Sequence, residues 1–381
     1  MSRSTWLTRI GVTLLTTAAV GVASAPAALG ASTGVVSVSG KTVVKYKAAT
    51  GKQNKVVITR SGKTVTIDDK VAIRAGKGCT KVSGDKTRIR CKLKYPPTQV
   101  QVYTYDRADS VTNKTSVPMY ADGGSADDVL TGGSSADRLN GHTGADRLYG
   151  NGGNDYFIGG SGNDRLSGSS GADALFAGSG NDVVYAGSGD DYVWGDTGHD
   201  VLYGLTGRDN IFGNQGADWL DGGDGNDRLT GDVYSTGISA DVLVGGSGTD
   251  VADYSSYRAP LLLELASGLD HRDDGVSGEG DAIDVDVENA LGGSADDLIY
   301  GGRLSNEIHG NGGNDRIHGE GGNDRLNGST GKDSVFGDDG DDVLTGVDDP
   351  DHADFLDGGF NGAFGDQCLA GAADTVRDCE R

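Results

Sequence analysis

Residues 159–167 read GGSGNDRLS, and variants of this nine-residue unit fill about half of the 381-residue chain. An aspartate recurs every nine residues through twelve consecutive units, and an apolar residue stands two positions after each of these aspartates. Glycine, which accounts for 66 residues, recurs before each aspartate. A fixed period of this kind predicts a solenoid built from stacked repeats. The twelve aspartates are Asp128, Asp137, Asp146, Asp155, Asp164, Asp173, Asp182, Asp191, Asp200, Asp209, Asp218 and Asp227.

Each unit divides into a turn and a short strand. The apolar residue lies between two polar or aromatic residues, which predicts a three-residue strand whose middle side chain points inward. The glycines supply the positive φ angles that the six-residue turn needs. Two units, or 18 residues, would return the chain to the same face one strand spacing further along, about 4.8 Å. The sequence therefore predicts an all-β fold with two parallel sheets and a thin aliphatic core.

The same stacking predicts a metal site. Aspartates 18 residues apart, such as Asp146 and Asp164, would lie about 5 Å apart and repel each other unless a cation lay between them. Carboxylates and the carbonyls of glycine-rich turns are hard oxygen ligands, which suit Ca²⁺ and its six to eight ligands. The four cysteines lie outside the repeats and the six histidines do not cluster, so a transition-metal site is not indicated.

A second series of units follows the first. It begins at Asp297, has Asn306 in place of aspartate, and continues with Asp315, Asp324, Asp333 and Asp342. Asp241 and Asp250 form a short pair between the two series.

The units resemble the RTX, or haemolysin-type, calcium-binding repeat, GGxGxDxUx, where U is a large aliphatic residue. The resemblance covers roughly residues 123–253 and 292–345. It implies a right-handed parallel β-roll in which Ca²⁺ ions lie between turns two repeats apart. The ligands carried over are the twelve aspartates from Asp128 to Asp227, and Asp315, Asp324, Asp333 and Asp342; Asn306 is left out because it lacks a carboxylate. Several units depart from the pattern at the second glycine, which is replaced by His142, Asn151, Ser169, Asp196, Leu205 and Asn214.

Charge divides the remaining chain. Residues 32–105 hold 16 Lys and Arg against 3 Asp, whereas residues 106–381 hold 15 basic and 53 acidic residues. We expect residues 31–105 to form a small basic β domain with strands near 35–38, 42–47, 55–60, 64–67, 87–91 and 99–103. Residues 106–122 are expected to be a linker, 254–291 an inserted loop or set of strands, and 346–381 a C-terminal cap. The basic domain could attract an anionic cell-wall polymer or nucleic acid, but we favour a solvated basic face, or docking on the acidic roll, as the explanation of its charge.

The N-terminus and the cysteines both indicate export. Residues 1–30 have basic residues, then a short apolar stretch and small residues, as in a signal peptide. The four cysteines predict disulfides in an oxidising compartment. Three pairings are possible, and we favour Cys79–Cys91 and Cys368–Cys379 because the two pairs lie at opposite ends of the chain. No later segment is apolar enough to cross a membrane.

The sequence thus predicts a secreted, non-catalytic Ca²⁺-binding protein whose repeats fold on binding the ion. We found no HExxH motif, no nucleotide-binding loop and no GxSxG in a strand–turn–helix setting. The alternatives are a cell-wall or glycan-binding adhesin and a cryptic polysaccharide-modifying enzyme; nucleic acid is not the expected partner. Outward-facing aromatic residues would stack in columns that either bind glycan or another protein, or only stiffen the sheets. They include Phe176, Trp194 and Phe212 on one face, Tyr185 and Tyr203 on the other, and also Tyr192 and Trp219.

Overall fold

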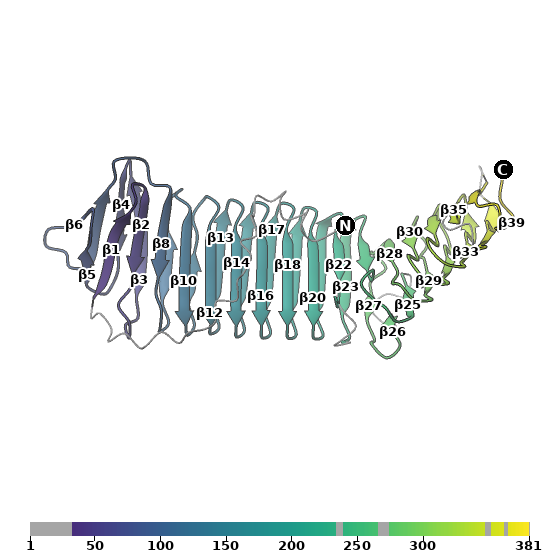
Figure 1. Cartoon of the computed structure of the whole chain (residues 1–381), viewed down its shortest axis with the longest axis horizontal. Coiled ribbons are helices and arrows are strands. Elements are labelled where there is room, and N and C mark those ends of the chain that lie inside the picture. Colours follow the sequence, from purple (N-terminus) through teal and green to yellow (C-terminus); the bar gives the residue numbers. More distant parts are fainter. Residues whose placement is uncertain (1–32, 234–238, 266–273, 347–351, 362–364, 381) are drawn as a thin grey trace.

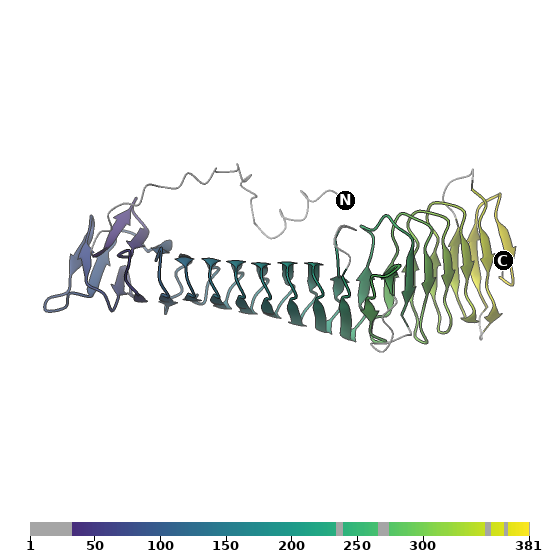
Figure 2. The same ribbon diagram turned by 90° about the horizontal axis from the view of Figure 1, so that it is seen from below.

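The computed structural model describes residues 33–233, 239–265, 274–346, 352–361 and 365–380. The chain is all-β, and most of it is a parallel β-solenoid of about 14 turns stacked along the long axis of the molecule (Figure 1, Figure 2). This confirms the predicted fold class. The predicted signal peptide, residues 1–30, lies outside the described residues.

The described strands form three main sheets, which we call sheets A, B and C. Sheet A runs the whole length of the molecule. Its strands, in spatial order, are β5 (Ile73–Ala75), β1 (Gly34–Ser39), β2 (Val43–Lys47), β8 (Gln99–Tyr103), β10 (Met119–Ser125), β12 (Arg138–Thr143), β14 (Tyr156–Ser161), β16 (Ala174–Ser179), β18 (Tyr192–Thr197), β20 (Asn210–Gln215), β22 (Arg228–Thr230), β24 (Val251–Asp253), β28 (Asn289–Leu291), β30 (Glu307–His309), β32 (Arg325–Asn327), β35 (Val343–Gly346) and β38 (Gln367–Ala370).

Sheets B and C share the opposite side of the solenoid. Sheet B consists of β6 (Cys79–Lys81), β7 (Arg88–Lys92), β4 (Thr64–Asp68), β3 (Lys55–Ser61), β9 (Ser110–Asn113), β11 (Val129–Thr131), β13 (Arg147–Gly152), β15 (Arg165–Ser170), β17 (Val183–Ser188), β19 (Val201–Thr206), β21 (Trp219–Gly225), β23 (Val242–Gly248) and β27 (Ala282–Ile283). Sheet C consists of β26 (Gly275–Val276), β25 (Leu261–Glu264), β29 (Leu298–Tyr300), β31 (Arg316–His318), β33 (Ser334–Phe336), β36 (Phe355–Asp357) and β39 (Thr375–Arg377). A short pair, β34 (Asp339–Gly340) and β37 (Phe360–Asn361), lies apart from them.

Within the repeats, each strand pairs in parallel with the strand 18 residues further along. Leu148 of β13 pairs with Leu166 of β15, and Phe157 of β14 pairs with Leu175 of β16. The inward side chains at this position are almost fully buried throughout both blocks. Most strands of the first block are six residues long where three were expected, because the first three residues of the next unit continue the parallel pairing. In the second block the strands are mostly three residues long, as expected.

The N-terminal strands are largely antiparallel and continue the two sheets of the solenoid. β1 pairs antiparallel with β2, and β3, β4 and β7 form an antiparallel ribbon. β2 pairs in parallel with β8, which pairs in parallel with β10 of the first coil. The six expected strands are present, and β5 and β6 were not foreseen. The disulfide between Cys79 and Cys91 joins β6 to β7.

Two other segments differ in detail from the expectation. Residues 106–122, expected as a linker, contain β9 and the start of β10, which pair in parallel with β11 and β12. Residues 254–291 contain β25 and β26, where sheet C begins, and β27, which is the last strand of sheet B. The insert therefore replaces sheet B by sheet C while sheet A continues past it. In the last coil the Cys368–Cys379 disulfide is present, and Cys368 pairs in register with the core residue Leu344.

Candidate metal sites

Each turn places one aspartate directly before a strand, and these aspartates are linked along the molecule. The backbone N–H of each donates to Oδ1 of the aspartate one coil further on; for example, Asp146 donates to Asp164 at 2.7 Å, and Asp164 donates to Asp182 at 2.6 Å. The same bond recurs through the first block. We call these rows carboxylate ladders A, B and C, after the sheet whose strands they precede. All sixteen predicted aspartates lie in one of them.

The second carboxylate oxygen of most ladder residues is buried and has no hydrogen-bond partner. The side chains are at most 3 % exposed. A buried polar atom without a partner is unusual in a folded protein and calls for an explanation such as a bound ion. This orphaned Oδ2 is found at Asp109, Asp128, Asp146, Asp155, Asp164, Asp173, Asp182, Asp191, Asp200, Asp209, Asp218, Asp227, Asp241, Asp250, Asp315, Asp324 and Asp342.

A backbone carbonyl lies close to many of these oxygens. A methyl group placed on Gly150 would lie 2.0 Å from Oδ2 of Asp155 and 2.9 Å from the carbonyl oxygen of Gly168. The two oxygens are therefore within about 5 Å of each other, close enough for one ion to contact both. The same arrangement recurs around Gly141, Gly168, Gly195 and Gly319.

Burial makes the metal-free ladder electrostatically unfavourable. Burial, together with the neighbouring carboxylates of the same ladder, raises the pKa of Asp128, Asp155 and Asp191 to about 8. For Asp164, Asp182 and Asp209 burial raises the pKa to about 7. The accepted backbone hydrogen bond lowers the pKa but does not offset burial. At neutral pH the folded ladder thus holds many carboxylates that are costly to ionise without a cation.

We call a turn closed when the side chain of its Asp or Asn accepts a backbone N–H group of the same turn. Three of the predicted turn positions are closed in this way. Asp137 accepts the N–H of Met119 at Oδ1 and that of Gly133 at Oδ2, so both oxygens are used. Asp297 likewise accepts the N–H groups of Leu261 and Gly293, and Oδ1 of Asn306 accepts the N–H of Gly302. In each case the preceding coil contains no repeat turn at the corresponding position. Asp137 therefore has no orphaned oxygen to offer, unlike the other aspartates of the first block.

The ladders also include acidic residues that the sequence analysis did not select. Asp218 donates to Asp241, which donates to Asp281 after a gap of 40 residues, while Asp250 donates to Oε2 of Glu288. Among the described residues, the additional members are Asp109, Asp241, Asp250, Asp281, Glu288, Asp297, Asp354, Asp366 and Asp374. The register offered a signal for Asp241, Asp250 and Asp297. For Asp281 and Glu288 the spacing is irregular and only the three-dimensional pairing identifies them.

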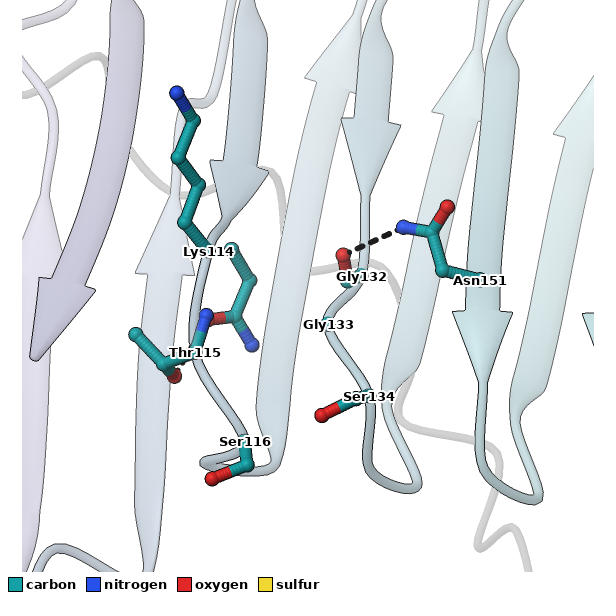
Figure 3. Close-up of a pocket in the computed structure, with 8 residues that line it drawn as sticks. Lys114, Thr115, Ser116, Gly132, Gly133, Ser134 and Asn151 are labelled. Carbon is teal, nitrogen blue, oxygen red and sulfur yellow. Dashed lines mark hydrogen bonds between the residues drawn. The ribbon is translucent and has the colours of Figure 1, made fainter.

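The turn keeps its conformation in the units in which another residue replaces the second glycine. His142, Asn151, Ser169, Asp196, Leu205 and Asn214 all have φ between 71° and 78°, so each adopts the left-handed conformation that glycine would favour. Asn151 adds a contact of its own: its Nδ2 donates to the carbonyl of Gly132 at 2.9 Å (Figure 3). This pair borders a polar hollow formed by the Asn113–Ser116 loop and the first turn of ladder A. The hollow has no carboxylate, and Lys114 is its one charged residue.

Most of the predicted outward aromatic residues lie in the expected columns, with their ring faces turned toward one another. Phe176 and Trp194 stack at a centroid distance of 4.6 Å, and Trp194 and Phe212 at 5.2 Å, both nearly parallel. Tyr185 and Tyr203 stack in the same way on sheet B. Because each ring covers the next, this geometry stiffens the sheets and leaves little ring face for a sugar.

The donor set fits Ca²⁺. It consists of carboxylate and carbonyl oxygens from flexible, glycine-rich turns, which is the chemistry that Ca²⁺ prefers. Among the described residues no three His, Cys, Asp or Glu side chains already converge as ligands of one metal ion. Carbonyl oxygens would therefore have to complete each coordination sphere, and a bound ion would supply the positive charge that the buried carboxylates lack.

The parallel solenoid and its carboxylate-bearing turns define a protein of the calcium-binding β-roll class. A sequence profile of the RTX calcium-binding nonapeptide repeat matches residues 122–157, 131–166, 158–193, 167–202, 194–229, 230–254, 291–326 and 318–353. The chain belongs to this family. A search of curated proteins gave no match.

The closed turn at Asp137 leads to a prediction about ion number. We expect Asp182→Asn to lower the number of bound Ca²⁺ ions by about one or two per chain, because Oδ2 of Asp182 is buried without a partner and can serve as a ligand. Asp137→Asn should leave the number unchanged, because both oxygens of Asp137 already accept backbone N–H groups. Equilibrium dialysis at saturating Ca²⁺ measures both. An equal loss in the two variants would contradict the distinction.

Proposed function

We propose that this protein is an extracellular, non-catalytic Ca²⁺-binding protein whose β-roll forms as the ion binds. The observation that carries the proposal is the series of buried carboxylate oxygens without partners, repeated in coil after coil. Membership of the RTX calcium-binding family supports Ca²⁺ as the ion. The two disulfides support an oxidising, extracellular location. None of the described residues forms a helix long and apolar enough to span a bilayer.

Binding and folding should be coupled. The carboxylates that would hold Ca²⁺ come together only in the folded roll, so the binding free energy contributes to folding. Extracellular calcium modules bind with dissociation constants of about 10⁻⁴–10⁻³ M, and we expect the ladders to respond in this range. The protein would then be folded outside the cell and unstructured where free Ca²⁺ is scarce.

A calcium titration followed by far-UV circular dichroism tests this proposal. The mature chain, freed of metal by a chelating resin at pH 8, should give a coil spectrum that converts cooperatively to a β spectrum with Ca²⁺. Mg²⁺ should fail at the same concentration, because it demands a smaller octahedral site. A β spectrum that is the same with and without Ca²⁺ would overturn the proposal.

A cell-wall or glycan-binding role is a second proposal, and the N-terminal ribbon is the surface that favours it. Arg90 and Lys92 of β7 are exposed and lie in register with Thr66 and Thr64 of β4. Cations flanked by hydroxyl groups suit an anionic polymer. The expected result is salt-sensitive retention of the protein on purified cell wall. Arg90→Ser with Lys92→Ser should abolish it, and retention equal to that of the parent protein would exclude this surface.

A further inference from the structure

The sequence between Asp227 and Asp241 exceeds the nine-residue spacing by five residues and contains an extra carboxylate, Asp232. Asp241 follows the preceding repeat aspartate after 14 residues instead of nine. The ladder nevertheless continues, because the N–H of Asp218 donates to Oδ1 of Asp241 at 2.9 Å. Asp232, directly after Gly231, is 2 % exposed, and its Oδ2 is buried without a partner.

The insert brings two more carboxylates to this turn. Asp281 accepts the N–H of Asp241 at 2.8 Å, and its Oδ2 accepts the hydroxyl of Tyr254 at 2.8 Å. Glu279 accepts the hydroxyl of Tyr257 at 2.9 Å and the N–H of Val276 at 2.6 Å. A methyl group on Gly275 would lie 2.2 Å from Oε2 of Glu279 and 3.2 Å from Oδ2 of Asp281, so these two oxygens are within about 5.5 Å of each other.

We call Asp232, Asp241, Glu279 and Asp281 the junction cluster. All four are at most 5 % exposed. Glu279 and Asp281 have neutral donors on both oxygens, whereas Asp232 and Asp241 each keep one buried oxygen without a partner. Within the part of the chain that the structure describes, no Lys, Arg or His forms an ion pair with any of the four. The cluster thus concentrates buried negative charge that the described residues do not neutralise.

The junction cluster holds more buried carboxylates than an ordinary repeat turn does. Burial, reinforced by the neighbouring Asp281, raises the pKa of Asp241 to about 10. It also raises the pKa of Asp281 to about 8, with Glu279 making the largest contribution among the neighbouring charges. An ordinary repeat turn contributes one ladder carboxylate. Here Asp232, the ladder residue Asp241, and Glu279 and Asp281 of the insert together contribute four carboxylates. More carboxylate ligands give a tighter Ca²⁺ site.

We propose that the junction cluster, which shares Asp241 and Asp281 with ladder B, is a second kind of Ca²⁺ site that binds more tightly than the ordinary repeat turns and holds the insert against the roll. Its carboxylates do not already converge at bonding distance. The ion therefore draws Asp232 and Asp241 together, with carbonyl oxygens or water completing the six to eight ligands. The proposal adds a second class of site to the proposed function, but it does not require the ladders to bind Ca²⁺.

Isothermal titration of the metal-free mature chain with CaCl₂ tests the proposal. The parent chain should show about one ion per chain bound at least tenfold more tightly than the remaining ions. Asp232→Asn should remove this tight class while leaving the weaker ions and the Ca²⁺-induced circular dichroism signal. Asp164→Asn, in the middle of ladder B, should do the reverse. Glu307→Gln is the charge-matched control, because Glu307 is exposed and lies outside the cluster.

The outcomes separate the two proposals. A tight class that survives Asp232→Asn, or its absence from the parent chain, would overturn the junction site and leave the ladders unaffected. A single tight ion without weaker ones would overturn calcium binding by the ladders and leave the junction site standing. If Asp232→Asn fails to fold, Glu279→Gln and the anomalous density of Tb³⁺ soaked into crystals of the parent chain provide the test. Density between Asp232 and Asp241 is expected, and a map without it there would overturn the site.

Discussion

In the absence of metal, lowering the pH from 8 to 5.5 should convert much of the unfolded chain to β structure. The pKa values of the ladder aspartates are raised by burial, to about 8 for Asp155 and Asp191 and to about 7 for Asp164, whereas the unfolded value is about 3.9. Between pH 4 and 8 the folded roll therefore holds more protons than the unfolded chain. The stability that this proton binding contributes is fully present below about pH 4 and is lost as the pH rises through the folded pKa values. Each unit by which a pKa is raised corresponds to about 1.4 kcal/mol.

Far-UV circular dichroism of the resin-treated protein against pH measures this effect, and pH 5.5 keeps the chain above its isoelectric point of about 4.5. With saturating Ca²⁺ the β signal should already be present at pH 8 and should not rise on acidification, because the ion takes the place of the protons. A metal-free roll that becomes more stable as the pH rises would show that the buried carboxylates do not control folding.

Gly207→Ala should be among the most damaging single substitutions in the roll. Gly207 has φ +130°, and a methyl group there would lie 2.0 Å from the carbonyl oxygen of Gly189 in the preceding coil. An L side chain in that conformation is strained, and the coils would have to separate to admit it. We expect a loss of about 3–5 kcal/mol in the free energy of unfolding at saturating Ca²⁺.

Leu205→Asn, two residues earlier in the same turn, is the matched control. Leu205 already has φ +76° and is 41 % exposed, and asparagine tolerates this conformation better than leucine. The control should therefore be neutral or slightly stabilising in denaturant unfolding. Equal destabilisation by the two substitutions would mean that the spacing between coils does not restrict the glycine position.

The sequence predicts the parts of the fold that repeat. The nine-residue period correctly predicts the pairing of residues 18 apart, such as Leu148 with Leu166, and the inward direction of the aliphatic residue. It also places the sixteen candidate aspartates in the ladders. The disulfide pairs Cys79–Cys91 and Cys368–Cys379 are confirmed, and six of the eight strands between residues 33 and 105 were predicted.

Features that depend on contacts across an irregular spacing could not be predicted. Asp281 and Glu288 continue the ladders after gaps of 40 and 38 residues, and no period connects them to the repeats. Sheet C begins within an insert whose register has lapsed, so the replacement of one sheet by another has no periodic signal. The closed turn at Asp137 depends on the direction of the Gly133 N–H group, which cannot be deduced from the repeat pattern. These exceptions lie where a ladder begins, ends or passes the insert.

Sheet A pairs from the N-terminal strands to the last coil without interruption, and this restricts how such a molecule can change in length. After deletion of 18 consecutive residues from the middle of the first block, each remaining strand would still pair with a strand of the same sheet, and each ladder aspartate would still follow another of the same ladder. Deleting nine would transfer every later strand to the opposite sheet and set the aromatic columns out of line. The rod can therefore be lengthened or shortened by whole coils, and half a coil is not a permitted step.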